Sequence, residues 1–281
     1  MSAKNLTEVV REKIVSQLIH AEYRPGHAFK LREMTESGDF AGISQTPIRE
    51  ALLQLVAKDI LVGQRGFSIR VPSPTVQGLA EVRAIRIRLE VMAATAGLGR
   101  WDEEGLARLA QIHERVMAAK KARNTDDILR SNVEFHFALY APADMPYLSS
   151  LLRQLWAITG PSIRYLYEGE QPAPVAGRHK HEDIMEALRT RDAQMLERAI
   201  SDDGVLHGEK ILAAVRERLN PEALAIQAFK NIEGTRKRQH IGRLMKKSGA
   251  AGPGLPETGA DRLRSGDRHG ATVNHILRPR D

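Results

Sequence analysis

The clearest periodic pattern in the chain lies between Ser44 and Leu55. Apolar residues recur there at three- and four-residue spacing, which places them on one face of a helix: Ile48, Ala51, Leu52 and Leu55. Ser44 is a favourable N-cap, and Pro47 falls in the first turn, where its missing N–H costs no hydrogen bond. The polar residues Gln45, Thr46 and Arg49 lie off the apolar face. The pattern predicts a short helix that presents polar side chains at its N-terminal end.

The neighbouring patterns place this helix third in a series. They predict helices over Leu6–Leu18 and from about Lys30 to Ser37, with a turn at 23–26 between them. A hairpin follows, because the apolar segments Ile60–Val62 and Phe67–Val71 flank the turn-forming residues 63–66. This order is that of a winged helix-turn-helix. An ordinary three-helix bundle with a surface arginine is the alternative, and the hairpin disfavours it.

After Pro72–Pro74 the pattern changes to long helices that run from about Val76 to Arg218. The predicted fold class is therefore mainly α, with an N-terminal winged helix-turn-helix followed by an all-α helical-bundle ligand-binding domain. We assign residues 1–72 to the first domain, 73–78 to a linker, 79–218 to the second domain and 219–281 to a basic, partly disordered tail.

Polar residues interrupt the apolar faces of three helices in the second domain. Asn132 and His136 share a face with apolar residues on a helix over about 126–140. His181 and Asp203 do the same on two later helices, where Asp203 aligns with Ala199, Ile200 and Leu206. Buried polar groups need partners, so a common cavity with a metal ion or a ligand would satisfy these four. If the helix registers are one turn off, His179 or His207 could substitute for His181 or Asp203.

The four residues leave two interpretations open. A single histidine on an apolar face is usually a hydrogen-bonded core residue, whereas two histidines and a carboxylate on three such faces favour a site. Imidazole with carboxylate or amide oxygen suits Zn, Ni, Mn or Fe and does not choose among these metals.

Composition adds modest constraints. The 281-residue chain has no cysteine, which excludes disulfides and thiol catalysis. It lacks an apolar run of membrane-spanning length and an apparent signal peptide, so we expect a cytoplasmic protein without a membrane partner.

Most of the net charge of +7 comes from the segment after 220, with 12 Lys and Arg against 6 Asp and Glu. Residues 223–247 could form a basic helix, although such charge runs are usually only solvated.

Residues 6–72 resemble the DNA-binding domain of the GntR family of bacterial transcription regulators. The family pattern is Pro-Gly, an Arg-Glu helix and Ser-x-x-Pro-[Ile/Val]-Arg-Glu-Ala-Leu-x-x-Leu, matched by Pro25-Gly26, Arg32-Glu33 and 44–55. The resemblance implies a DNA interface made by Arg32, Ser44, Gln45, Thr46, Arg49, Arg65 and Gly66. The family commonly has arginine in place of Gln45, and glutamine favours adenine where arginine favours guanine. The segment 35–42 is a few residues longer than usual.

The second domain resembles the all-α effector domain, called FCD, of the FadR-type branch of the same family. That branch carries Asp-x-x-x-His, then a second histidine and a third 22 residues later. Asn132 and His136, and His181 and Asp203, stand at these spacings. Asn replaces the Asp and Asp replaces the last His, so metal binding is retained with the carboxylate moved, or it is weakened or lost. The resemblance implies that the same four residues, with Arg86 of the Arg-x-x-Leu-Glu signature, bind an organic-acid effector; alternatively, Arg86 only pairs with Glu90.

We therefore predict a non-enzymatic transcription regulator. By the resemblance, its partners are double-stranded operator DNA, a small organic acid and a second copy of the chain, and two-fold symmetry predicts an imperfectly palindromic operator. One alternative is a metal-dependent, hydrolase-like helical domain fused to a nucleic-acid-binding module, with Glu134 or Glu182 as the base. Another is a regulator whose second domain serves only for dimerisation.

Overall fold

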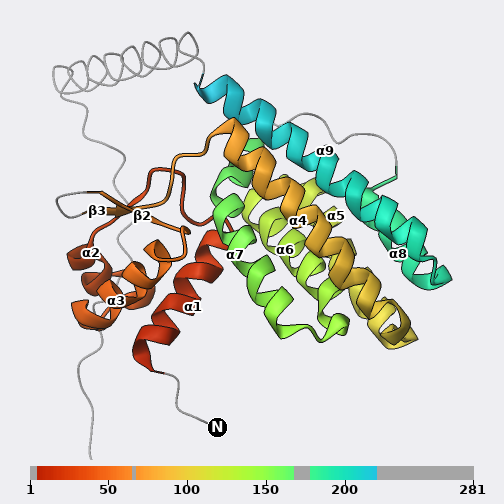
Figure 1. Cartoon of the computed structure of the whole chain (residues 1–281), viewed down its shortest axis with the longest axis horizontal. Coiled ribbons are helices and arrows are strands. Elements are labelled where there is room, and N and C mark those ends of the chain that lie inside the picture. The colour runs from red at the N-terminus through yellow and green to blue at the C-terminus, as the bar shows by residue number, and fades with distance from the viewer. Residues whose placement is uncertain (1–4, 65–67, 168–177, 220–281) are drawn as a thin grey trace, which may run out of the picture. The chain divides into compact units, whose positions relative to one another are not determined.

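The computed structural model describes residues 5–64, 68–167 and 178–219 (Figure 1). Its N-terminal part contains helices α1 (Leu6–Ile19), α2 (Leu31–Glu36) and α3 (Gln45–Val56). The short strands β1 (Ala28–Phe29), β2 (Val62–Gln64) and β3 (Ser68–Arg70) form an antiparallel sheet in the order β1-β3-β2. Three helices and then a hairpin occur in the predicted order.

The apolar face of α3 anchors it to this core. All four apolar residues of the predicted stripe, Ile48, Ala51, Leu52 and Leu55, are at most 1% exposed. Ser44 stands at the N-cap position with extended backbone, but its side chain accepts no capping hydrogen bond. Ser44 was thus placed correctly, whereas the expected capping contact is absent.

The long segment before α3 is accommodated by an extra turn. Helix α2 ends at Glu36, and a short 3-10 helix, η1 (Gly38–Phe40), follows it. Gly38 and Gly42 have positive φ angles of 72° and 81°, which a residue with a side chain rarely adopts. Phe40 is 4% exposed within the core, so the additional residues form an ordered, packed connection.

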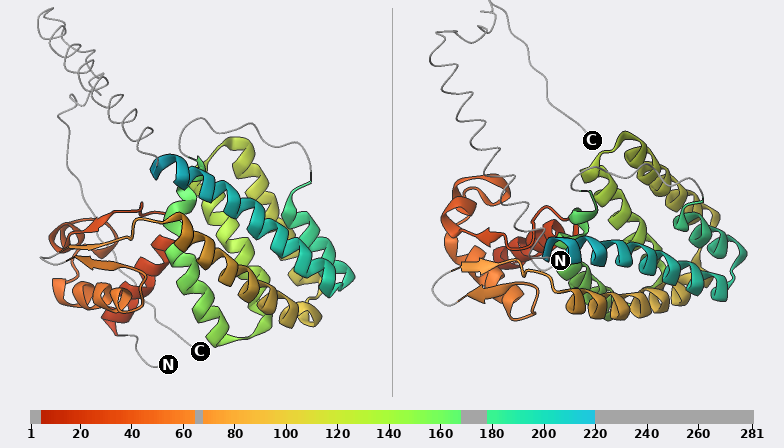
Figure 2. Two further views of the ribbon diagram at one scale, coloured as in Figure 1. Left: turned by 45° about the horizontal axis from the view of Figure 1, so that its top comes forward. Right: turned by 90° about the horizontal axis from the view of Figure 1, so that it is seen from above.

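The second part is built from helices, with no strand among its described residues. They are α4 (Val76–Gly97), η2 (Leu98–Arg100), α5 (Glu103–Ala122), α6 (Thr125–Tyr140), η3 (Ala141–Ala143), α7 (Pro146–Ile163), η4 (Arg164–Tyr167), α8 (Lys180–Thr190) and α9 (Ala193–Leu219). Figure 2 shows these helices from two further sides. The mainly α fold class is confirmed. Helix α4 begins at Val76, inside the expected linker.

Side-chain caps fix the beginnings of several helices. Asp102, Asn124 and Thr75 accept backbone N–H groups at the first turns of α5, α6 and α4. A capping side chain satisfies a backbone donor that has no partner within the helix. These caps set where each helix starts and therefore which of its residues face the interior.

Helix α7 joins the two parts through a continuous apolar core. Trp156 and Ala157 belong to the same buried cluster as Ile14 and Leu18 of α1. The helices approach closely at Gly160, where an added Cβ would lie 2.2 Å from the carbonyl oxygen of Leu18. No helix among the described residues is long and apolar enough to cross a bilayer. The tail after 219, with its predicted basic helix, lies outside the described residues.

Candidate functional site

The N-terminal end of α3 presents the predicted DNA-contacting side chains to solvent. Ser44, Gln45, Thr46 and Arg49 are all exposed. Arg49 has no ion pair with another residue of the described segments, so its guanidinium is free to bind an acceptor. Arg32 on α2 is also exposed and pairs with Glu36 at 2.7 Å. Arg65 and Gly66 of the wing lie outside the described residues.

Three of the four interior polar residues come together from different helices. His136 of α6, His181 of α8 and Asp203 of α9 are 4%, 0% and 3% exposed. His136 Nε2 lies 3.5 Å from Asp203 Oδ2, and one ligand atom from each of the three residues lies within 4.8 Å of the others. Asn132 is half-buried and lines the adjoining cavity. We call His136, His181 and Asp203 the interior cluster.

One neighbour of this cluster differs from the expectation. Leu206 was expected on the buried face of α9 with Asp203, yet it is 43% exposed. Leu206 and Ile200 lie about 60° from Asp203 on opposite sides of the helix axis, so the buried face of α9 extends toward Ile200 and ends short of Leu206. Ala199 and Ile200 do share the buried face, at 5% and 1% exposure.

Burial and the neighbouring charges shift the pKa values of the interior cluster in opposite directions. Burial lowers the pKa of His136 and of His181, and Asp203 opposes the shift in both. Burial raises the pKa of Asp203, but the imidazoles of His207, His136 and His181 outweigh it and hold the pKa of Asp203 well below its usual range. An imidazole binds a metal ion only when it is neutral, and a carboxylate binds best when it is ionised. The lowered pKa values of the two histidines and of Asp203 therefore suit a metal site.

Unpaired atoms in the interior cluster point to a missing partner. Neither ring nitrogen of His181 has a hydrogen-bond partner in the described part of the chain. Asp203 Oδ1 has only an ion-pair contact of 3.0 Å with His207 Nδ1, which also lies 3.1 Å from the Asp203 carbonyl oxygen. Unsatisfied buried polar atoms are costly, and a cation would accept these lone pairs. The two imidazoles and one carboxylate therefore fit a Zn, Ni, Mn or Fe ion.

A small cavity of about 60 Å³ adjoins the interior cluster. Its polar lining includes Arg86, Asn132, His136, Thr159, Asp203 and His207, and its apolar lining includes Trp156 and Leu212. Such a volume admits about two waters or a few ligand atoms without any movement of the walls. The cavity is therefore a place for a small polar molecule.

Arg86 of α4 reaches this cavity within an interior network. Its Nη1 donates to Thr159 Oγ1 at 3.0 Å, its Nε lies 2.9 Å from Glu90 Oε1, and its guanidinium stacks 3.9 Å from the centroid of the Trp156 ring. Trp156 Nε1 in turn donates to Glu90 at 2.9 Å. The alternative pairing with Glu90 exists, but Glu90 is 1% exposed, so the pair is buried and not on a helix surface.

Sequence reasoning missed the partners that α7 supplies to Arg86. Thr159 and Trp156 contact Arg86 only because α7 packs against α4, and no motif links these positions. Glu90 could have been found, since it follows Arg86 by one helical turn and lies on the buried side with Ala93 and Ala94. Its burial, however, depends on Trp156.

The two glutamates considered as hydrolytic bases do not belong to the interior cluster. Glu134 is exposed on α6 and forms an ion pair with Arg115. Glu182 accepts the backbone N–H of His179 at 3.1 Å, which caps α8. Both carboxylates are thus engaged elsewhere.

Comparison with known proteins places both parts of the chain. The model of the FCD domain matches residues 81–203. The HTH-type transcriptional regulator McbR of Escherichia coli K12 is 30% identical over 195 residues, which cover 69% of this chain and 87% of McbR. The HTH-type transcriptional repressor RspR of the same organism is 26% identical over 223 residues, which cover 76% of this chain and 92% of RspR.

Solved structures agree with these relatives. The structure of E. coli McbR/YncC superposes with a TM-score of 0.68 at 28% identity, covering 78% of this chain and all of that one. A GntR regulator from Rhodococcus sp. RHA1 has the same fold, with a TM-score of 0.59 at 17% identity and coverage of 74% and 98%. With its exposed recognition helix and helical second domain, the chain is a DNA-binding transcription regulator that belongs to the GntR family, in the branch that carries an FCD domain.

Proposed function

We propose that a small organic acid binds in the cavity beside Arg86 and changes the affinity of the regulator for its operator. The observation that carries this proposal is the position of Arg86, whose guanidinium lines the cavity together with His136 and Asp203. A carboxylate entering the cavity would pair with this guanidinium in competition with Glu90. Arginine favours such pairs because it binds carboxylates through two parallel hydrogen bonds.

In this proposal a divalent ion occupies the interior cluster. His136, His181 and Asp203 would hold it, with Asn132 available as a neutral oxygen donor from the cavity wall. A bound ion would supply positive charge that attracts the carboxylate of the effector. Arg86 would then orient that carboxylate from the α4 side, and Trp156 would exclude water behind it.

Helix α7 offers a route from the effector to the DNA-binding part. Thr159 and Trp156 of α7 contact Arg86. The neighbouring residue Gly160 packs against the end of α1. Arg164 adds a hydrogen bond of 2.8 Å to the carbonyl of Ala21. Because packed helices shift as units, an effector that displaces Thr159 or Trp156 would move α7 against α1.

For the DNA contact, we propose that α3 enters the major groove with Gln45, Thr46 and Arg49 toward base edges and phosphates. Ser44 and Arg32 would add contacts from the helix start and from α2, and Arg65 and Gly66 from the wing. Gln45 would favour adenine at its position in the operator.

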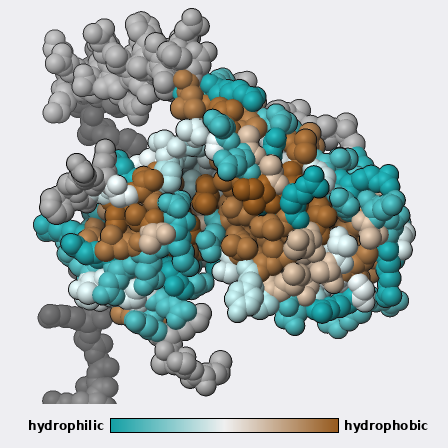
Figure 3. All heavy atoms as spheres, in the orientation of Figure 1, coloured by the Kyte–Doolittle hydropathy of each residue, from teal (hydrophilic) through white to brown (hydrophobic). Residues whose placement is uncertain are grey.

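A dimer fits this scheme and the imperfectly palindromic operator that two-fold symmetry predicts. Ile85 and Met92 of α4 and Leu151 of α7 are 44%, 53% and 50% exposed, and Figure 3 shows hydrophobic residues gathered on the face that carries α4 and α7. We propose that a second copy covers this face. Light scattering on the purified full chain tests it: a dimer supports the proposal, and a monomer at operator-binding concentrations contradicts it.

The effector proposal is tested by fluorescence anisotropy on the DNA upstream of the protein's own gene. A panel of small mono- and dicarboxylic acids is added to the full chain, and an effector is expected to change the dissociation constant by about 5- to 150-fold. Arg86→Gln should abolish this response but keep DNA binding. Arg108→Ala, which removes an exposed charge from α5, is the matched control and should respond normally.

Two results would contradict the proposal. The first is that no acid of the panel changes DNA affinity or the melting temperature of the wild-type protein, which would favour a second domain that serves only for dimerisation. The second is that the Arg86→Gln protein retains the full response, which would place the effector elsewhere.

A further inference from the structure

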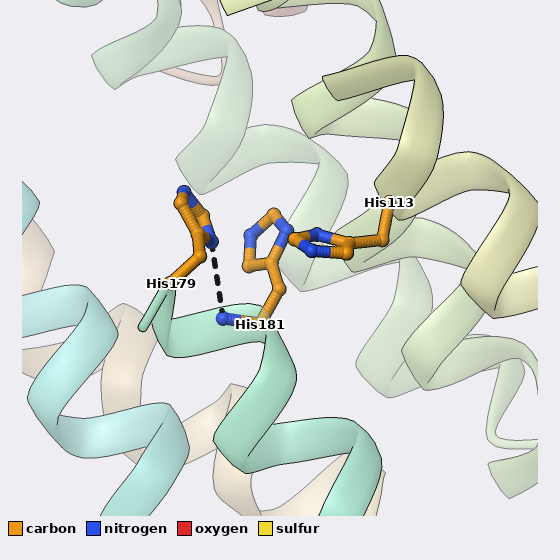
Figure 4. A group of neighbouring side chains, drawn as sticks. All are labelled: His113, His179 and His181. Atoms are coloured by element: carbon orange, nitrogen blue, oxygen red, sulfur yellow. Dashed lines mark hydrogen bonds between the residues drawn. The ribbon is translucent and has the colours of Figure 1, made fainter. Parts of the chain in front are cut away.

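A second group of histidines lies next to the interior cluster and shares one residue with it. His113 of α5, His179 at the N-cap of α8 and His181 in the first turn of α8 turn their rings toward one another (Figure 4). Their ring centroids are 4.5 to 5.6 Å apart. One nitrogen from each ring lies within 4.8 Å of the others. We call these three residues the histidine cluster.

The cluster contains buried nitrogens without partners. His181 is 0% exposed and His113 is 8% exposed. Both ring nitrogens of His181 and the Nδ1 of His113 lack a hydrogen bond within the described segments. His181 cannot turn away from this arrangement, because its ring stacks on Phe135 with an interplanar angle of 2° and a centroid distance of 3.7 Å. A protein rarely buries such atoms unless something else binds them.

A cationic group already occupies part of this space. The Nζ atom of Lys120 contacts His179 Nε2, while the Nδ1 of His179 accepts the backbone N–H of His181 at 3.2 Å. Burial lowers the pKa of Lys120 and lowers the pKa of His179 to about 3, because both groups lose hydration of their charged forms. Lys120 sits on a flexible four-carbon stem and can withdraw. A cation would then take the single lone pair of His179 at Nε2, with the ring proton moved to Nδ1 and the bond from His181 N–H given up.

The Glu182 carboxylate lies beside the three imidazoles, and its Oε1 also accepts the backbone N–H of His179, so an ion would use the lone pairs that this cap leaves free. Glu182 Oε1 lies 3.9 Å from His113 Nε2, and the Glu182 side chain is 40% exposed. Three imidazoles and one carboxylate form a donor set that suits the first-row ions Zn²⁺, Ni²⁺, Co²⁺ and Cu²⁺. None of these donors except His181 belongs to the interior cluster.

We propose that His113, His179 and His181, completed by Glu182, form a second binding position for a divalent transition-metal ion, distinct from the interior cluster of His136, His181 and Asp203. A neutral imidazole has a single lone pair, so His181 serves one position at a time. The two positions are therefore alternatives, and an ion at one of them weakens binding at the other. Lys120 is the internal competitor for the second position.

Cobalt titration of the full chain tests this proposal, because Co²⁺ coordinated by nitrogen and oxygen absorbs visible light. The wild-type protein should bind one ion. The double variant His136→Gln, Asp203→Asn removes the interior cluster and should still bind one ion. Adding His113→Gln to that double variant should weaken binding by more than about 10-fold, the lower end of the loss caused even by changes to outer partners of metal sites.

Matched variants separate this position from its neighbours. Lys120→Met in the double variant should strengthen Co²⁺ binding, because it removes the competing amine. His20→Gln, which changes the histidine at the C-cap of α1, should leave every titration unchanged. His113→Gln alone should leave binding at the interior cluster intact, so failure of the second position is distinguishable from failure of the first.

The proposal is overturned if the double variant binds no Co²⁺ while circular dichroism shows that it is folded. It is equally overturned if His113→Gln leaves the affinity of the double variant unchanged. Two ions bound to one wild-type chain would contradict the alternation through His181. None of these measurements uses DNA or an effector.

Discussion

Arg49 and His181 are both polar residues on amphipathic helices, yet α3 leaves Arg49 exposed to solvent whereas α8 buries His181 completely. The guanidinium of Arg49 is hydrated until it meets an acceptor, so its presence costs the fold little. Both ring nitrogens of His181 have lost water without gaining a hydrogen bond in the described part of the chain. The exposed N-terminal end of α3 is thus nearly neutral for folding, whereas the interior cluster costs stability until something binds.

The largest expected effect concerns His181→Leu. Leucine has a similar volume and no polar atoms, so in chelator-treated protein the variant should be as stable as the wild type or more stable, because two unsatisfied nitrogens disappear. Addition of Zn²⁺ or Ni²⁺ at 100 times its dissociation constant should stabilise the wild type by about 2.7 kcal/mol and leave the variant unchanged. Urea unfolding with and without the ion measures both effects.

The control for His181→Leu is Met185→Leu on the same helix, because methionine and leucine have similar volumes. Ala187→Leu is unsuitable, because the larger side chain would overfill the core. The Met185→Leu protein should keep the stabilisation by the ion. If His181→Leu loses several kcal/mol in the presence of chelator, the histidine belongs to a satisfied core, and the contrast with Arg49 disappears.

The next effect concerns the junction at Gly160. Gly160→Ala would place a Cβ 2.2 Å from the carbonyl oxygen of Leu18, and backbone atoms cannot yield as a side-chain tip can. We expect a loss of about 1–3 kcal/mol in the free energy of unfolding, as for other overpacked positions. Thermal and urea unfolding measure it. Gly99→Ala is the control, because nothing lies within 4 Å of its added Cβ; equal stability of the two variants would contradict a close α1–α7 contact.

The contrast between the two regions also explains what the sequence could reveal. The apolar stripe of α3 and the polar residues beside it lie within 12 consecutive residues, so helical periodicity alone predicted the exposed face. The same periodicity predicted that His136, His181 and Asp203 lie on buried faces. Their convergence could be expected only as a hypothesis, because it depends on how three helices pack.

Contacts between side chains of different helices could not be predicted from the sequence. Thr159 and Trp156 reach Arg86 from 73 and 70 positions away, and neither carries a motif. The missing cap at Ser44 is a smaller case, because its residue type and position were right but its hydroxyl orientation depends on local geometry. Periodicity specifies which face of a helix is buried, whereas the partner of a buried group depends on tertiary packing.

The smallest expected effect concerns Ser44→Ala, which distinguishes a role of Ser44 in capping α3 from a role in contacting DNA. Its side chain makes no capping bond, so Ser44→Ala should change the free energy of unfolding by less than about 0.5 kcal/mol. Asn124→Ala removes a cap that does bond, to the backbone of Asp127, and should cost about 1 kcal/mol. If Ser44 contacts DNA, its loss should weaken operator binding by about 2- to 10-fold, the effect of one hydrogen bond. A stability loss as large as that of Asn124→Ala would show that Ser44 caps α3 after all.

We propose that the exposed N-terminal end of α3 reads the operator. Fluorescence anisotropy on the DNA upstream of the protein's own gene, with unrelated DNA as competitor, tests it through Arg49→Ala. The account predicts that specific affinity falls by about 5- to 150-fold with unchanged circular dichroism. Arg108→Ala, which removes an equal charge from the exposed surface of α5, should bind like the wild type. Retention of specific affinity by the Arg49→Ala protein would contradict the account, because another element would then have to occupy the groove.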